Sequence, residues 1–175
     1  MPAEWRDFRS RVENFGKPNS VCNSCIMAPM FDPDTIVSPR LKRLHAYWTA
    51  KCGSRPMPSR ADIDPVEMPW ILGNLSLIEV RGEGDYLWRL DGSNLTAFFG
   101  CEMTGRSISE YPYPAFIGKM RATLDDAVRA GGPSRSVRRF SSKTQKWDYE
   151  SLYLPLSGDG QRIDMLMQAL EIDPR

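Results

Sequence analysis

The sequence predicts an α+β fold in which a five-stranded antiparallel sheet carries helices on one face. Two strand patterns, joined by turn residues over 82–85, precede the main helical patterns, and three more strand patterns follow them. The last two strands are separated by Ser157-Gly-Asp-Gly160, a tight turn. Short turns within each group imply antiparallel neighbours, and helices between the groups are expected to cover the sheet.

The chain divides into an N-terminal extension and one domain. Residues 1–36 are expected to form an extension or linker, with a short helix over 4–15 and then a stretch interrupted by prolines. Residues 37–175 are expected to form the domain. The whole chain is 41% hydrophobic, which is enough apolar material for one core.

The domain opens with an amphipathic helix. Ser38 is suited to cap it, Pro39 to occupy its first turn and Gly53 to end it. The apolar positions at helical spacing are Leu41, Leu44, Trp48 and Cys52. This apolar face exceeds what one small sheet edge must cover, so we expect the helix to support dimerisation or docking.

The middle of the chain alternates short elements. A short helix is expected from Asp64-Pro65 to Leu72, followed by strands over 75–80 and 86–90. Ser93 or Asn94 is expected to cap a helical turn that reaches Phe99 and closes at Gly100.

The last part of the chain contains one long helix and three strands. The helix is expected over 114–130, ended by two glycines. The strands are expected over 134–140, 147–156 and 163–172.

Charge and hydropathy exclude several classes of protein. The 23 basic and 22 acidic residues nearly cancel, which argues against a dedicated nucleic-acid binder. No apolar run is long enough for a membrane helix, and the first 15 residues lack the apolar core of a secretory signal. We therefore expect a cytoplasmic protein whose cysteines are thiols.

Three blocks of the sequence resemble a known family. They are Met57-Pro-Ser-Arg-Ala-Asp-Ile-Asp-Pro65 with 72–80, then Trp88-Arg-Leu-Asp-Gly92 with 99–106, then Tyr149-Glu-Ser-Leu-Tyr-Leu-Pro-Leu-Ser157 with Asp159-Gly160 and Asp164-Met165. Together they resemble a bacterial PAS-like family of the PAS_5 type, common in alphaproteobacteria, over about residues 40–172. The resemblance implies a PAS fold, a role in sensing or protein–protein signalling, and no shared catalytic site.

PAS domains often enclose a cavity between sheet and helices, and the pattern supplies residues for one. The expected pocket residues are Trp88, Leu90, Phe98, Phe99, Arg106, Tyr149, Met165 and Met167. A filled core with no cavity is the competing interpretation. Arg106 follows a Thr-Gly loop, where it is placed either to grip a carboxylate or phosphate or to pair with Asp91 or Glu102.

Metal and cofactor signals are weak. Cys22-x-x-Cys25 supplies two of the four ligands that zinc prefers, so we interpret it as an incidental pair and assign no metal. His45 is the only histidine and lies on the basic helix over 39–52, and the part that resembles the PAS core contains none. This disfavours haem, with Cys or Met ligation as the open alternative, and a Ser–His–Asp triad using His45 has no supporting motif. The residues around Cys101 do not match the cysteine motif of light-sensing PAS domains. No cofactor is required by the sequence, and its identity, if one exists, stays open.

The favoured function is a stand-alone sensory domain, not an enzyme, that binds a small molecule or docks a signalling partner, with a homodimer expected. The sequence leaves two alternatives. A small enzyme on the same scaffold lacks a recognisable nucleophile–base pair. A nucleotide or nucleic-acid binder would use the basic residues of 37–60 and 132–147, and predicts binding that depends steeply on salt.

Overall fold

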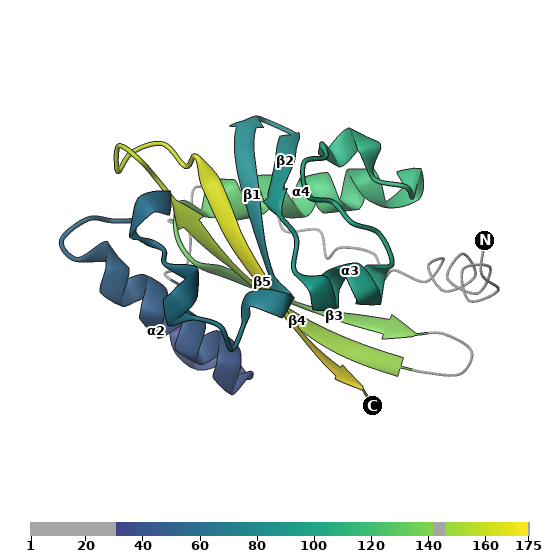
Figure 1. The fold of residues 1–175 in the computed structure, drawn as a ribbon, viewed down its shortest axis with the longest axis horizontal. Coiled ribbons are helices and arrows are strands. Elements are labelled where there is room, and N and C mark those ends of the chain that lie inside the picture. Colours follow the sequence, from purple (N-terminus) through teal and green to yellow (C-terminus); the bar gives the residue numbers. More distant parts are fainter. Residues whose placement is uncertain (1–30, 142–145, 175) are drawn as a thin grey trace, which may run out of the picture.

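The sheet and its helices are present as predicted. The computed structural model describes residues 31–141 and 146–174, so residues 1–30 of the extension expected over 1–36, with its expected helix, lie outside the described residues. Its main elements are α2 (Pro39–Cys52), β1 (Leu75–Gly82), β2 (Asp85–Leu90), α3 (Ser93–Phe99), α4 (Pro114–Ala130), β3 (Ser134–Ser141), β4 (Lys146–Leu156) and β5 (Met165–Pro174). The five strands form one antiparallel sheet in the order β2-β1-β5-β4-β3 (Figure 1).

Helix α2 begins and ends where the sequence predicts. The Ser38 hydroxyl accepts a hydrogen bond from the Leu41 amide, Pro39 occupies the first turn, and Gly53 follows the helix with a φ of 57°. Its four apolar positions are buried in the chain's own core. The apolar face that we expected to serve a partner is therefore already covered by the sheet.

The helices lie on both faces of the sheet. Glu150 of β4 and Glu171 of β5 are register partners and so share a face. Both contact the start of α2: Glu150 accepts from the amides of Val37 and Ser38, and Glu171 pairs with Arg40. Tyr149 precedes Glu150 and therefore points to the opposite face.

Helix α4 covers that opposite face. Arg138 of β3 is the register partner of Tyr149 and donates a hydrogen bond to Thr123 of α4. In Figure 1, α2 lies in front of the strands and α4 passes behind them. The predicted helical face is thus the α4 face, and α2 adds a second layer on the other side.

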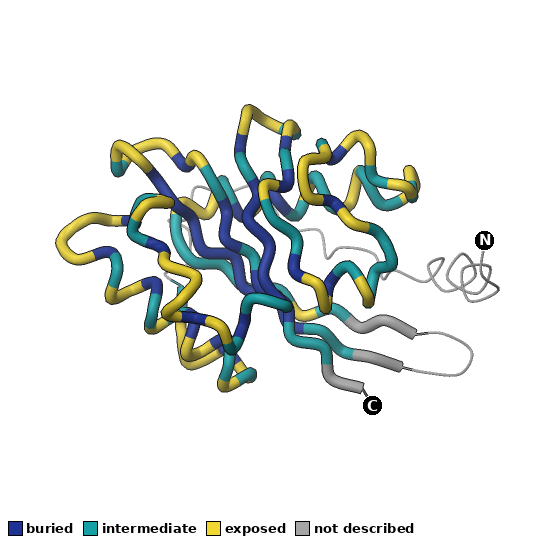
Figure 2. Tube along the Cα trace, viewed as in Figure 1, coloured by how far each residue is buried: buried dark blue, intermediate teal, exposed yellow. Residues whose placement is uncertain are grey.

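Buried residues follow the central strands (Figure 2). The largest fully buried side chains of the sheet are Tyr86 of β2, Ile78 of β1, and Leu152 and Leu154 of β4. Both outer layers close over these strands, which is why residues of both parities in β4 and β5 are apolar and buried.

Two local predictions need correction. The helix expected from Asp64 to Leu72 is instead two separate 3₁₀ turns, Pro65–Glu67 and Leu72–Asn74. Helix α3 is capped by neither Ser93 nor Asn94: its N-cap is Gly92, which has no side-chain cap bond.

Candidate functional site

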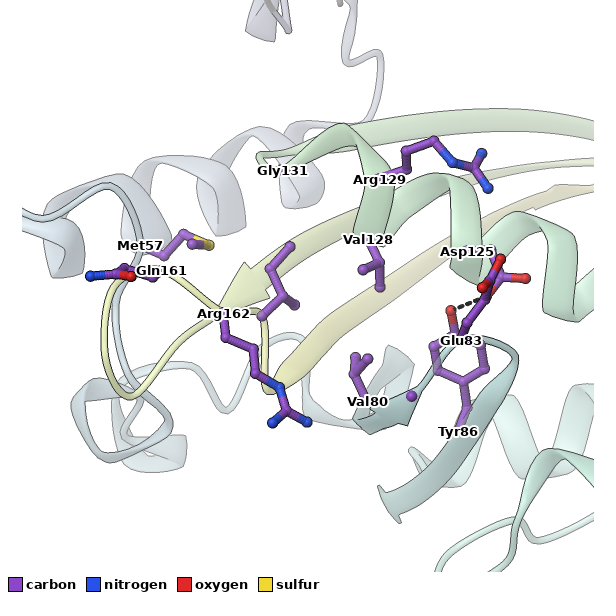
Figure 3. A pocket seen from close by; sticks show the side chains of 12 residues that line it. Met57, Val80, Glu83, Tyr86, Asp125, Val128, Arg129, Gly131, Gln161 and Arg162 are labelled. Atoms are coloured by element: carbon purple, nitrogen blue, oxygen red, sulfur yellow. Dashed lines mark hydrogen bonds between the residues drawn. The ribbon is translucent and has the colours of Figure 1, made fainter.

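A pocket of about 480 Å³ lies at one end of the sheet, on the α4 face (Figure 3). We call it the sheet-end pocket. It is an open pocket, bordered by the C-terminal end of α4, the β1–β2 turn, the β4–β5 loop and Met57. Its lining residues are Met57, Val80, Gly82, Glu83, Tyr86, Asp125, Val128, Arg129, Gly131, Gln161, Arg162 and Ile163.

One wall of the pocket is fixed by hydrogen bonds between α4 and the β1–β2 turn. An Asp125 carboxylate oxygen accepts from the Tyr86 hydroxyl at 2.5 Å and from the Gly84 amide at 3.0 Å. Arg121 Nε donates to the Gly84 carbonyl at 2.8 Å. Burial, reinforced by the bond to Asp125, raises the pKa of Tyr86, so this phenol stays protonated and donating at neutral pH.

The turn that meets α4 requires glycine at position 84. Its φ is 69°, and a Cβ there would lie 2.8 Å from Cδ of Arg121. The close approach lets the Arg121 side chain bond the Gly84 backbone directly, which attaches α4 to the hairpin.

The pocket combines an apolar floor with charged groups at its rim. Val80 and Ile163 are buried, and Val128 packs on the core beside them. Figure 3 shows the Arg162 side chain extending from the β4–β5 loop past Val80. Arg162 lies 3.9 Å from Asp164, a long and solvent-exposed ion pair. An apolar floor with a few polar groups is the composition of sites that hold small organic molecules.

The residues predicted to form a pocket do not converge at one place. Trp88 is buried and Tyr149 half-buried, and both point to the α4 face. Met165 and Met167 point to the α2 face, because Met167 is the register partner of Leu154, which alternates with Tyr153. The sheet itself therefore separates the two methionines from Trp88, which corrects the expected convergence.

The other predicted pocket residues lie around α3 and its following loop. Phe98 and Phe99 are half-buried and pack edge to face at 5.0 Å, and Leu90 is half-buried. Arg106 is exposed; within the described chain it pairs with neither Asp91 nor Glu102, and its carbonyl accepts from the Trp88 amide. None of the eight predicted residues lines the sheet-end pocket.

Few features of the sequence indicate the sheet-end pocket. Its lining comes from four segments far apart in the chain, most of them turns and helix ends. The one available signal was Gly84 in the hairpin turn, whose positive φ accompanies the close approach of α4.

Tyrosines and one cysteine occupy the layer between the sheet and the helices on the α4 face. Burial raises the pKa of the Cys101 thiol to about 11, against the effect of its hydrogen bond with Tyr111. Burial also raises the pKa of Tyr111, and the neighbouring Cys101 and Tyr149 add to the increase. Cys101 is thus a protonated thiol at neutral pH and a poor nucleophile.

Half of the six basic residues of 37–60 are ion-paired within the chain. Three ion pairs join them to acidic residues that follow in sequence: Arg40–Glu171 at 2.8 Å, Lys51–Glu67 at 2.6 Å and Arg55–Asp62 at 2.8 Å. Arg43 lies over the Trp70 ring, 4.2 Å from its centroid. These contacts reduce the number of cations on this surface that are available to phosphate groups.

His45 stands among aromatic rings. Its imidazole lies 5.3 Å from Phe31 and 6.3 Å from Trp48, between ring centroids, and burial lowers its pKa. Over 31–141 and 146–174, no three His, Cys, Asp or Glu residues are grouped to hold a metal ion; Cys22 and Cys25 lie outside these ranges. Across the same ranges, no helix has the length and apolarity needed to cross a membrane.

Comparison with known proteins identifies the architecture. The model of a PAS domain family, PAS_5, matches residues 36–170. Solved structures similar to the chain include the LOV protein of Rhodobacter sphaeroides, with 15% identity, a TM-score of 0.41 and coverage of 63% of this chain and 68% of that chain. The PAS domain of BvgS from Bordetella pertussis has 17% identity, a TM-score of 0.45 and coverage of 60% and 82%. No curated protein matches the sequence.

Proposed function

Because the chain belongs to the PAS_5 family of PAS domains, we propose that it is a sensory domain that binds a small molecule in the sheet-end pocket. The observation that supports this most is the pocket itself, about 480 Å³ in volume with an apolar floor and charged rim. The proposal assigns no catalytic step to the domain.

The walls of the pocket offer a route for signalling. Asp125 and Arg121 tie α4 to the β1–β2 turn, while Gln161 and Arg162 belong to the loop that begins β5. A ligand that fits better to one arrangement of these three walls shifts the population toward that arrangement. Strand β5 carries the shift to the α2 face, where Glu171 contacts Arg40.

The output is proposed to pass to a second copy of the chain or to a signalling partner. The apolar face of α2 is not the contact, since it is buried in the core. Exposed apolar residues remain beside α2: Val37 before its start and Val66 in the 3₁₀ turn that contacts Tyr47 of α2. Light scattering over a range of concentrations tests for the homodimer, which predicts a mass above 19.9 kDa that falls on dilution.

Native mass spectrometry of the freshly purified protein, repeated under denaturing conditions, tests the sensor proposal. We expect extra mass that disappears on denaturation, and its value begins to identify the ligand. A bare chain mass, from preparations in several hosts, would contradict small-molecule binding and favour a domain that only docks proteins.

A further inference from the structure

The two edges of the sheet differ in whether another segment pairs with them. At the β2 edge, the Trp88 amide donates to the Arg106 carbonyl at 3.0 Å, and the Gly105 amide donates to the Trp88 carbonyl at 2.7 Å. Strand β3 forms the other edge, with β4 on one side of it. Within 31–141 and 146–174, no backbone–backbone hydrogen bond outside the β3–β4 ladder involves β3. In the described chain, the β3 amides and carbonyls that point away from β4 are therefore available to a further strand.

Apolar side chains flank the β3 edge on the α2 face. Among the described residues, the exposed large apolar side chains are Val37, Val66 and Val137. Val137 of β3 is 51% exposed and is the register partner of Glu150. The Glu150 carboxylate in turn accepts from the Val37 amide at 2.9 Å. Cross-strand partners lie side by side on one face, so two of the three exposed valines adjoin the same glutamate beside this edge.

The edge strand is basic. Over 131–147 the sequence has five basic residues and no acidic residue, and three of the five, Arg135, Arg138 and Arg139, belong to β3. Arg135 is paired with Glu150 on the α2 face. Arg138 is half-buried on the opposite face, and across the described residues it has no carboxylate within ion-pair distance. The charge of this edge therefore repels a second basic strand and attracts an acidic one.

We propose that the β3 edge binds an extended acidic segment of a partner protein, which adds a strand to the sheet. Alternation places one set of the segment's side chains beside Val137 on the α2 face and the other set beside Arg138 on the α4 face. The preferred segment therefore alternates apolar and acidic residues. A second copy of this chain is disfavoured, because an antiparallel pair of β3 strands brings arginines against arginines. This surface is separate from the sheet-end pocket and does not depend on the function proposed for it.

Titration of the full chain with an eight-residue peptide of alternating glutamate and valine tests the proposal, because the peptide matches the length of Ser134–Ser141. Amide chemical shifts and amide hydrogen exchange are the measurements. We expect saturable binding, with the shifts centred on β3 and slower exchange of every second β3 amide. The same peptide with lysine in place of glutamate is expected not to bind. A peptide of glutamate and D-valine has the same charge but cannot place its two kinds of side chain on opposite faces of a pleated strand, so it is also expected not to bind.

Val137→Glu is expected to weaken binding of the acidic peptide roughly tenfold or more, because it removes the apolar contact and places like charges side by side. Val66→Glu is the matched control, since it makes the same change at a residue that is 83% exposed and outside the sheet. It is expected to leave peptide binding unchanged. Circular dichroism and thermal unfolding verify that each variant is folded.

An absence of saturable binding to the full chain would overturn the proposal, as would equal affinity in folded Val137→Glu. Equal binding of the D-valine peptide or of a short oligothymidylate would also overturn it, because any polyanion would then suffice. Slow exchange of all β3 amides in the free chain would do the same, since a second copy or another segment of the chain would already be paired with this edge.

Discussion

Glycine at position 92 is required by a backbone contact that the sequence does not display. A Cβ at Gly92 would lie 2.3 Å from the Gly73 carbonyl oxygen, so the two chain segments touch directly. Gly92 is also the N-cap of α3, in place of Ser93 or Asn94. The Asn94 amide is used elsewhere, as a donor to Asn74 Oδ1 at 2.7 Å.

Gly92→Ala is therefore expected to destabilise the fold by about 1–3 kcal/mol, because a rigid backbone must move to admit one methyl group. Gly118→Ala is the matched control. It lies inside α4 with nothing within 4 Å of its Cβ position, and it is expected to stabilise by about 0.5–1 kcal/mol. Denaturant unfolding measures both; equal effects of the two changes would contradict the account of Gly92.

At the scale of elements, one buried carboxylate attaches α2 to the sheet. Glu150 accepts from the Val37 amide at 2.9 Å, from the Ser38 amide at 2.8 Å and from Arg135. Burial favours a higher pKa for Glu150, but these three donors outweigh it and the pKa is lowered from 4.5. These two amides lie just before the first turn of α2, where the helix dipole also favours a negative charge.

Glu150→Gln is expected to cost about 1–3 kcal/mol of unfolding free energy near neutral pH, since charge-assisted bonds become neutral ones. A carboxyl with a lowered folded pKa contributes stability that is present above its unfolded pKa and is lost as pH falls through the folded value. The difference in unfolding free energy between wild type and Glu150→Gln should therefore become smaller below about pH 4.5. A free-energy difference that does not change with pH would contradict the role of the ionised Glu150 carboxylate.

The pKa of Glu171 is shifted in the opposite direction to that of Glu150. Burial raises its pKa from 4.5 against the attraction of Arg40, so its ionisation costs stability as pH rises above that value. Relative to wild type, Glu171→Gln should gain stability between acid and neutral pH, where Glu150→Gln loses it. Unfolding curves at several pH values measure both trends.

The sequence predicts elements better than it predicts what they pack against. Helix α2 was recognisable from Ser38, Pro39 and the spacing of Leu41, Leu44 and Trp48, and its bounds are confirmed. Which surface it covers depends on long-range contacts, such as the bond from Trp48 Nε1 to the Pro155 carbonyl at 2.8 Å, 107 residues away. The prediction that α2 leaves an apolar face uncovered was wrong for that reason.

Strand alternation alone does not predict which residues of the sheet face α4. A period of two shows that Met165 and Met167 share a face, but both faces of β5 are apolar, so the sequence does not reveal which one meets α4. Pairing with β4 decides it. The sheet-end pocket was missed because its walls are a turn, a helix end and a loop that only the folded chain brings together.

At the scale of the whole molecule, all six tyrosines have a raised pKa, and burial is the largest cause for each. A phenol whose folded pKa exceeds its unfolded value of 10 contributes stability below pH 10 that is lost as pH rises toward the folded value. The domain is thus expected to unfold in alkali, with tyrosine ionisation and loss of structure coinciding. Near-ultraviolet absorbance measures tyrosine ionisation and circular dichroism measures folding. A folded chain in which half of the tyrosines are ionised at pH 10 would contradict this expectation.

The central claim is that a small molecule occupies the sheet-end pocket, and retained mass in a variant that fills this pocket tests it most directly. Val128→Trp places a large ring in the lining, while Val66→Trp makes the same change at a residue that is 83% exposed and outside the pocket. Native mass spectrometry is predicted to show a retained ligand in wild type and Val66→Trp, and its loss from folded Val128→Trp. A ligand retained equally in all three proteins would contradict the assignment of the pocket.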